Sequence, residues 1–258
     1  MRVDLAQCKG LYLRNILSSP IKPNPQIDTS KKQQVEEMFD NISARYDFLN
    51  HFLSLGIDKA WRKIVRKRVA ETGAKFILDV ATGTADLAIE LSKIPDSKII
   101  GIDISRGMLD RGDVKIDQLK LNERITLQQA DSEDLPFEDH TFDAITVSFG
   151  VRNFENLENG MKEMWRVLKP GGMLAVLEFS KPRNPLFSAI YWFYFKYVLP
   201  TVGRLVSKDA TAYTYLPQSV AAFPEGDKFK ELAKSYGFSD VKFKGLTFGI
   251  STLYRCVK

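Results

Sequence analysis

Short apolar runs alternate with helix-like patterns through the middle of the chain. The run 76–80 stops at the Ala-Thr-Gly-Thr-Ala turn 81–85, after which apolar residues recur at helical spacing up to Leu91. A second apolar run, 99–102, ends in Asp103, about 20 residues past the turn, where a dinucleotide-type fold places the acid that binds ribose hydroxyls. The pattern predicts half of a nucleotide-binding βαβ unit; a βα turn without a ligand is the alternative.

The turn departs from the usual glycine pattern, and the departure narrows the class of ligand. An Asp-x-Gly-x-Gly-x-Gly turn would place glycines at 81, 83 and 85, but the chain has Ala81, Gly83 and Ala85. The close backbone approach that a pyrophosphate requires is therefore less well provided. A nucleoside without phosphates fits better, and S-adenosylmethionine is such a ligand. Asp79 at the strand end suits its positively charged methionine moiety.

The same alternation continues to the end of the chain. Further strands are expected at 125–129, 143–150 and 173–179, with a hairpin formed by 241–246 and 247–257. Strands that alternate with helices imply right-handed crossovers and a parallel sheet, so that ligands bind at the carboxyl ends of the strands. Those ends bear Asp79, Asp103, Asp131, Ser148 and Glu178. Asp131 is placed to accept a hydrogen bond from an adenine amino group; the alternative is a surface acid that caps the next turn.

Two segments outside this alternation are expected to cover the site. Residues 29–57 open with a capping box and are aromatic-rich yet polar, which is typical of lid helices over a pocket, although a purely structural helical pair fits as well. Residues 183–224 interrupt the alternation with a densely aromatic run at 186–199, too short to cross a bilayer, which takes roughly 20 residues. We expect a substrate cap there, with a core helix as the alternative. The whole of 29–258 is predicted to be one domain, preceded by a loosely ordered arm, 1–28.

Composition excludes some classes of function. The formal charge of +5 and the pI near 9.0 are only mildly basic, so a solvated basic face explains them without nucleic acid. The basic residues are expected on the outer face of the helix that begins near Trp61. A role of this face at a membrane surface is the less favoured interpretation. Two cysteines, Cys8 and Cys256, and two histidines are too few and too scattered to build a metal site, so we expect none.

Four signatures together resemble one known family, the ubiquinone/menaquinone biosynthesis C-methyltransferases, over about 31–258. They are Phe-Asp-Asn-Ile-Ser-Ala-Arg-Tyr-Asp at 39–47, the turn 78–86, Ser-Phe-Gly-Val-Arg-Asn at 148–153, and 166–172 with 177–182. The resemblance implies an α/β fold of the class I S-adenosylmethionine-dependent methyltransferases. That fold is a Rossmann-like, seven-stranded, mostly parallel sheet with helices on both faces, here with an N-terminal helical lid and an inserted cap.

The resemblance also implies the reaction and its residues. The reaction would be C-methylation of the ring of demethylmenaquinol to menaquinol, with S-adenosyl-L-methionine as donor and S-adenosylhomocysteine as product. The implied cofactor contacts are Thr84, Asp103, Asp131, Ser132 and Ser148, to which the turn adds Asp79 and Gly83. The candidates for orienting or deprotonating the quinol are Arg152, Asn153, Tyr46, Asp47, His51 and Tyr215. Arg152 and Asn153 are favoured because they directly follow the fourth strand.

The resemblance implies a prenylated naphthoquinol as the partner. It also implies a cytoplasmic enzyme that contacts the inner face of the membrane peripherally. A homo-oligomer is left as an open alternative. Alternative acceptors are the benzoquinol intermediate of ubiquinone biosynthesis or another small lipid. An amino-methylating nucleic-acid enzyme would carry Asn/Asp-Pro-Pro-aromatic where this chain has 148–151, and a nicotinamide oxidoreductase would carry the fuller glycine turn. A cofactor-binding protein without catalytic activity is the remaining alternative.

Overall fold

The computed structural model describes residues 21–54, 56–182, 184–193, 197 and 211–258. One sheet orders its strands β3-β2-β1-β4-β5-β7-β6. The strands are β1 (Phe76–Val80), β2 (Lys98–Asp103), β3 (Ile125–Gln129), β4 (Phe142–Ser148), β5 (Leu168–Phe179), β6 (Asp240–Leu246) and β7 (Ser251–Val257). The first five strands run parallel, while β7 pairs antiparallel with both β5 and β6. The parallel sheet, its seven strands and the C-terminal hairpin are thereby confirmed.

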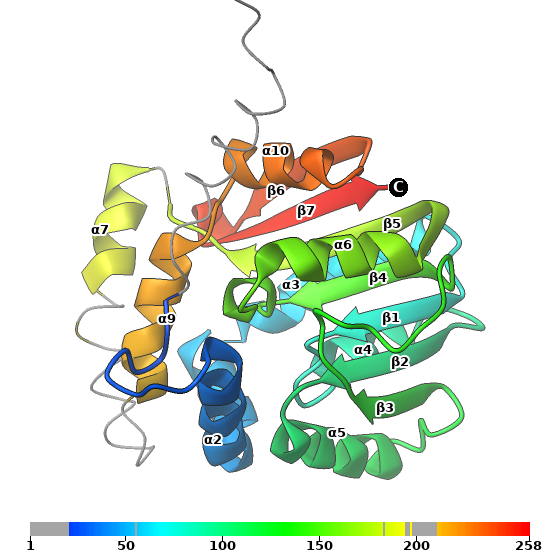
Figure 1. Ribbon diagram of the computed structural model, residues 1–258, viewed down its shortest axis with the longest axis horizontal. Coiled ribbons are helices and arrows are strands. Elements are labelled where there is room, and N and C mark those ends of the chain that lie inside the picture. The colour runs from blue at the N-terminus through cyan, green and yellow to red at the C-terminus, as the bar shows by residue number, and fades with distance from the viewer. Residues whose placement is uncertain (1–20, 55, 183, 194–196, 198–210) are drawn as a thin grey trace, which may run out of the picture.

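The helices cover both faces of this sheet (Figure 1). They are α2 (Lys31–Leu53), α3 (Ile57–Ala70), α4 (Asp86–Leu91), α5 (Arg106–Gln118), α6 (Leu157–Val167), α7 (Pro185–Phe193), α9 (Thr211–Ala222) and α10 (Asp227–Ser235), with 3-10 turns η1 (Val151–Asn153) and η3 (Thr247–Gly249). Among the described residues, no helix is both long and apolar enough to cross a membrane.

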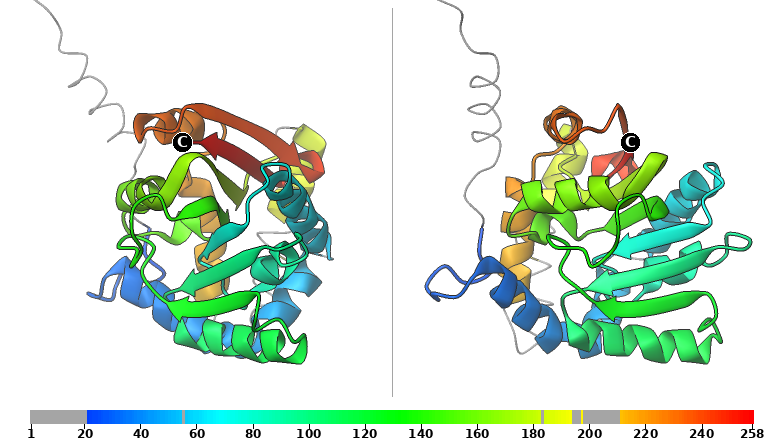
Figure 2. Two further views of the ribbon diagram at one scale, coloured as in Figure 1. Left: turned by 90° about the vertical axis from the view of Figure 1, so that its right-hand side faces the viewer. Right: turned by 45° about the vertical axis from the view of Figure 1, so that its right-hand side comes forward.

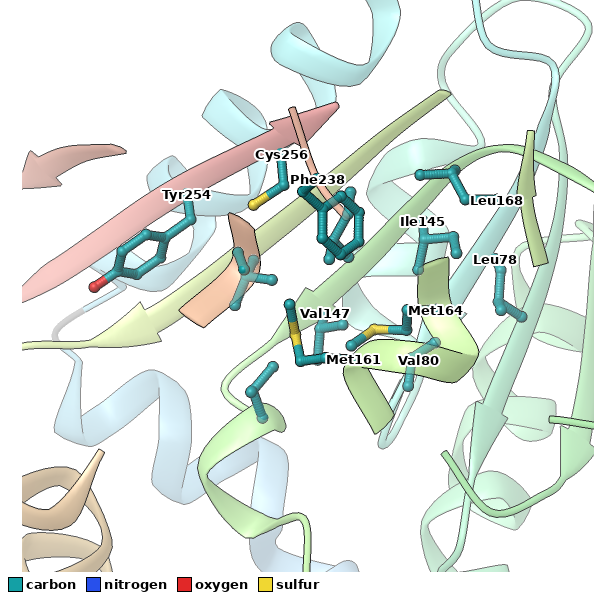
Figure 3. Packing of buried hydrophobic residues seen from close by; sticks show 14 of the residues in the cluster. Leu78, Val80, Ile145, Val147, Met161, Met164, Leu168, Phe238, Tyr254 and Cys256 are labelled. Carbon is teal, nitrogen blue, oxygen red and sulfur yellow. The ribbon is translucent and has the colours of Figure 1, made fainter. Parts of the chain in front are cut away.

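Two apolar layers form the core, one on each face of the sheet. Successive strand residues point to opposite faces, so Ile77 packs with α3 and α4 while Leu78 packs with α6 and α10. Figure 3 shows part of the second layer, in which Met161 and Met164 of α6 lie against Val147. Burial on both faces explains why the parallel strands read as continuous apolar runs instead of alternating ones.

The segments expected to cover the site lie at the carboxyl ends of the strands. Most of 29–57, predicted as lid helices, forms the single helix α2, because 31–53 contains no glycine or proline. Gly56, with φ +74°, is the N-cap residue just before α3. The predicted capping box is confirmed by reciprocal hydrogen bonds between Ser30 and Gln33. The described parts of 183–224 are mainly α7 and α9, and 1–20 of the predicted arm lie outside the described residues.

The turn after β1 uses the left-handed backbone at three alternate positions. Ala81, Gly83 and Ala85 have φ of 52°, 57° and 64°. These are the three positions at which the glycine-rich form of this turn places glycine, so the alanines adopt the glycine conformation at a cost of roughly 1 kcal/mol each.

Ala81→Gly removes that cost at one position. We expect the free energy of unfolding to rise by about 0.5–1 kcal/mol, measured by urea denaturation. The control is Ala60→Gly at an exposed site in α3, where glycine should lower the free energy of unfolding by about 1 kcal/mol. A loss of stability in both variants would contradict the explanation.

Candidate active site

A cleft lies at the carboxyl ends of the parallel strands and is lined in part by residues of α2. Figure 1 shows α2 beside these strand ends. The space in and above the cleft is about 700 Å³, open solvent included. Seven of the residues predicted for the site line it: Gly83, Asp103, Asp131, Ser132, Ser148, Asn153 and Tyr46. The cleft therefore gathers side chains that are up to 107 positions apart in the sequence, from Tyr46 to Asn153.

Two carboxylates are buried near the ends of β1 and β2; among the described residues, Asp103 lines the cleft and Asp79 does not. Asp79 accepts hydrogen bonds from the hydroxyls of Thr82 (2.6 Å) and Thr146 (2.5 Å). Asp103 accepts from the backbone N–H groups of Gly83 (2.8 Å) and Ser105 (2.9 Å). Burial disfavours the ionised forms and raises the pKa of each carboxyl to about 6, although these hydrogen bonds act in the opposite direction.

These residues fit S-adenosylmethionine. The carboxylate of Asp103 lines the cleft and is an acceptor for ribose hydroxyls, and Gly83 leaves the wall beside it without a Cβ. Within the described chain, the buried hydroxyl of Ser148 has no hydrogen-bond partner, so it can meet a polar ligand atom in the cleft. Thr84, by contrast, is buried and does not line the cleft among the described residues.

Helix α2 is fastened across the ends of β2 and β3. Near its start, Lys32 forms a short ion pair with Asp131, the acid predicted to face adenine. One oxygen of Asp40 accepts from the Ser105 hydroxyl (2.5 Å) and from the Gly107 backbone N–H (2.9 Å) at the start of α5. A Cβ on Gly107 would lie 3.0 Å from that carboxylate oxygen, so glycine allows the two helices to approach closely.

The far end of α2 is fastened to the turn after β1. Asp47 accepts hydrogen bonds from the Thr84 hydroxyl (2.5 Å) and from Lys115 Nζ (3.0 Å). Lys115 also reaches Asp86 (2.6 Å), which pairs in turn with Arg62 of α3 (3.0 Å). Both carboxylate oxygens of Asp47 are thus engaged, so its geometry favours a role in holding the lid over the turn.

A third attachment joins α2 to the loop after β4. Lys31 is buried, and its ammonium donates to the backbone carbonyls of Arg152 (3.0 Å) and Phe154 (2.7 Å). Burial and the nearby charge of Arg152 lower the pKa of Lys31 to about 8. Helix α2 is therefore tied to the short turn η1, which carries both residues that the sequence favours for the acceptor.

Arg152 is held by an ion pair with Glu178, the buried acid at the end of β5. Its terminal nitrogen Nη1 lies 2.7 Å from Glu178 Oε1, and its guanidinium sits 5.4 Å from the ring centroid of Phe179. In the described part of the chain, Arg152 Nε and Asn153 Oδ1 are buried without a hydrogen-bond partner. One donor and one acceptor without partners therefore belong to neighbouring residues; among the described residues, Asn153 lines the cleft and Arg152 does not.

Three aromatic rings form a wall next to this pair. Phe149, which lines the cleft, stacks on Phe179 with ring centroids 4.4 Å apart, and Trp61 lies 5.9 Å from Phe149 and 6.4 Å from Phe179. We call Trp61, Phe149 and Phe179 the aromatic wall. An apolar wall beside a few polar atoms is the usual composition of a small-molecule site.

Sequence reasoning left several of these contacts unrecognised. Lys31, Lys32 and Lys115 were not singled out because lysines near helix ends are ordinary surface residues, and only their partners reveal a role. Asp40 lies in the 39–47 signature, and this position was the one feature of the sequence that could have pointed to its role. His51 lies in α2, but its side chain is outside the described residues.

The chain was compared with known proteins. The model of the ubiE/COQ5 methyltransferase family matches residues 27–258. A demethylmenaquinone methyltransferase of Bacteroides fragilis is 46% identical over 245 residues, which cover 95% of this chain and 100% of that protein. A ubiquinone/menaquinone biosynthesis C-methyltransferase of Geotalea daltonii is 48% identical over 228 residues, which cover 88% and 97%.

Solved structures confirm the fold class. A SAM-dependent methyltransferase from Aquifex aeolicus matches with a TM-score of 0.53 and 19% identity, covering 74% of this chain and 87% of that one. A [4+2]-cyclase matches with a TM-score of 0.54 and 18% identity, covering 88% and 96%. Since proteins with different named reactions share this fold, the likeness supports the architecture alone.

The raised pKa of the buried carboxyls predicts how cofactor binding depends on pH. If Asp103 binds the ribose as predicted, the hydroxyls donate to its ionised form, so below pH 6 binding must first expel a proton. We expect the Kd for S-adenosylmethionine to rise by up to about tenfold per pH unit as the pH falls from 6 to 5, measured by calorimetry. Asp103→Asn should bind weakly with a smaller pH dependence, and a flat wild-type profile would contradict the assignment.

The attachment of α2 through Asp40 is also testable. Asp40→Ala removes both hydrogen bonds at the start of α5, so we expect the free energy of unfolding to fall by about 1 kcal/mol and the Kd for S-adenosylmethionine to rise about tenfold. Glu37→Ala is the matched control, because Glu37 is an exposed carboxylate on the same helix. Equal effects of the two substitutions would show that the contact does not hold the lid.

Proposed function

Because the chain belongs to the ubiE/COQ5 methyltransferase family, we propose that it methylates a ring carbon of demethylmenaquinol to give menaquinol. It is an S-adenosylmethionine-dependent C-methyltransferase of quinone biosynthesis. The observation that carries the choice of acceptor chemistry is the pair of buried atoms without partners among the described residues, Arg152 Nε and Asn153 Oδ1, beside the aromatic wall. A flat ring with hydroxyl groups at its edge suits such a site.

S-adenosylmethionine supplies an electrophilic methyl group on a sulfonium. A ring carbon is a weak nucleophile, so the chain must raise the electron density of the quinol. Asn153 Oδ1 can accept a hydrogen bond from a quinol hydroxyl, which draws the proton away from the ring oxygen. Arg152 Nε can donate to a ring oxygen as negative charge develops there, and an ionic hydrogen bond in a buried site stabilises that charge strongly.

The buried ion pair keeps this arrangement in place. Glu178 is fully buried and binds the Arg152 guanidinium at 2.7 Å, so the arginine cannot rotate away without leaving an unpaired carboxylate. The Arg152 backbone N–H also donates to Glu178 Oε2 (3.3 Å), which fixes η1. Because positioning supplies much of the rate of such a transfer, this rigidity supports a role for Arg152 and Asn153 in orienting the quinol.

The lid supports the same function by excluding water. Tyr46 and Phe39 of α2 both line the cleft and pack edge to face with ring centroids 5.9 Å apart. An apolar cover over the methyl-transfer site lowers the local dielectric constant and protects the sulfonium from water. We assign Tyr46 to this cover and Asp47 to its attachment.

We also propose that the enzyme works as a peripheral cytoplasmic protein at the inner face of the membrane, because a polyprenyl tail stays in the bilayer. On α3, the arginines are neutralised by ion pairs: Arg62 with Asp58, Arg66 with Glu90, and Arg68 with Glu71. Exposed lysines remain at four-residue spacing, Lys59, Lys63 and Lys67. Such a stripe supports attraction to anionic lipid.

The experiment incubates the purified protein with S-adenosylmethionine and chemically reduced demethylmenaquinone, with a demethylated benzoquinol precursor in parallel, and detects methylated product by mass spectrometry. We expect product from the naphthoquinol. Product from the benzoquinol alone would move the enzyme to the ubiquinone branch, and product from neither, with cofactor binding confirmed, would contradict the proposed acceptor class.

Asn153→Ala tests the role of η1. Loss of the acceptor should lower kcat by about 10- to 100-fold while the Kd for S-adenosylmethionine changes less than threefold, because the lost hydrogen bond is made to the quinol. Asn159→Ala, at an exposed asparagine of α6, is the matched control. Full turnover by Asn153→Ala would remove the basis for the assignment.

A further inference from the structure

The aromatic wall continues outward to the tip of the β6–β7 hairpin. The Trp61 indole donates to the Thr247 hydroxyl in η3 (2.8 Å), which ties the wall to the hairpin. The next residue, Phe248, stacks face to face on Phe187 of α7, with ring centroids 4.0 Å apart and planes 7° apart. Figures 1 and 2 show α7 beside this tip from different directions. Aromatic side chains thus lead from the cleft to the surface.

Two of these phenylalanines sit on backbone that favours glycine. Phe149 has φ +59° and Phe248 has φ +57°. A bulky residue in this region costs roughly 1–2 kcal/mol, which core packing often offsets. The stack on Phe187 buries little of Phe248, which is 67% exposed, so core packing does not offset this cost. A strained and exposed aromatic residue points to a ligand that covers it.

From this geometry we propose that Trp61, Phe149, Phe179, Phe248 and Phe187 form a track that binds the isoprenoid tail of the quinol. The inference rests on the proposed function, since it concerns the tail of the same substrate. A tail needs apolar groups that lead away from the ring site: Phe149 lines the cleft at one end of the track, and the Phe187–Phe248 pair lies at the other. The first isoprene units would pass the aromatic wall, and later units would reach Phe248.

Chemistry along the track favours a hydrocarbon chain. Ile57 and Ile250, both partly exposed, pack against the same apolar layer as Phe149 and Phe179. The hydroxyl of Thr247 already accepts a hydrogen bond from the Trp61 indole. Burial of isoprene methyls against them is worth about 25 cal/mol per Å² of apolar surface removed from water.

The test compares demethylmenaquinols that carry one and eight isoprene units, assayed in detergent micelles. For the wild type, we expect KM for the long-tailed substrate to be about five- to tenfold lower than for the short-tailed one. Phe248→Asn should bring this ratio close to one, because asparagine tolerates the left-handed backbone and removes the ring. Phe248→Trp keeps an aromatic ring at this position and should therefore keep the wild-type ratio of the two KM values. Leu119→Ser, at an exposed leucine just after α5, is the control and should leave it unchanged.

The outcomes separate this inference from the proposed function. Wild-type turnover of neither substrate would overturn the proposed function itself. Turnover of both with equal KM, or an unchanged ratio in Phe248→Asn, would overturn the track while leaving the function intact. If Phe248→Asn keeps the ratio in micelles but no longer sediments with anionic vesicles, Phe248 contacts the lipid surface and the track is again overturned.

Discussion

Burial of two carboxylates at the ends of adjacent strands is the constraint on which the site depends. Ionised groups are costly to remove from water, so Asp79 and Asp103 must be surrounded by donors. These donors come from the turn after β1, from β4 and from the loop after β2. The backbone of the turn and of that loop is therefore pinned at the place where a cofactor must approach it. The carboxylate of Asp103 can accept further hydrogen bonds, and the hydroxyls of a ribose can donate them.

One of these donors also connects Asp103 to α2. Ser105 donates its backbone N–H to Asp103 and its hydroxyl to Asp40 of α2. Thr84, in the turn after β1, donates separately to Asp47 of α2. Lys31 then links the lid to η1, where Arg152 and Asn153 lie.

Sequence reasoning succeeded where the determinant is local. The capping box at Ser30 and Gln33, the strand-ending acids and the hairpin all follow from residue spacing, and the structure has each of them. The alanines at 81 and 85 show a limit of that reasoning. Their small size was recognised, but alanine itself gives no sign of a left-handed backbone, and the structure shows that both residues adopt it.

The sequence by itself determined the order of strands and helices, the parallel sheet and the set of polar residues at its carboxyl edge, because hydrophobic periodicity and connection length are properties of the chain. Only the tertiary structure decided which of those residues face one another. Asp47 and Lys115 are far apart in sequence, as are Arg152 and Glu178, and each pair forms only after the sheet has brought its carboxyl ends together. A charged side chain in a sequence can be catalytic, structural or solvated, and its partners in space decide between these roles.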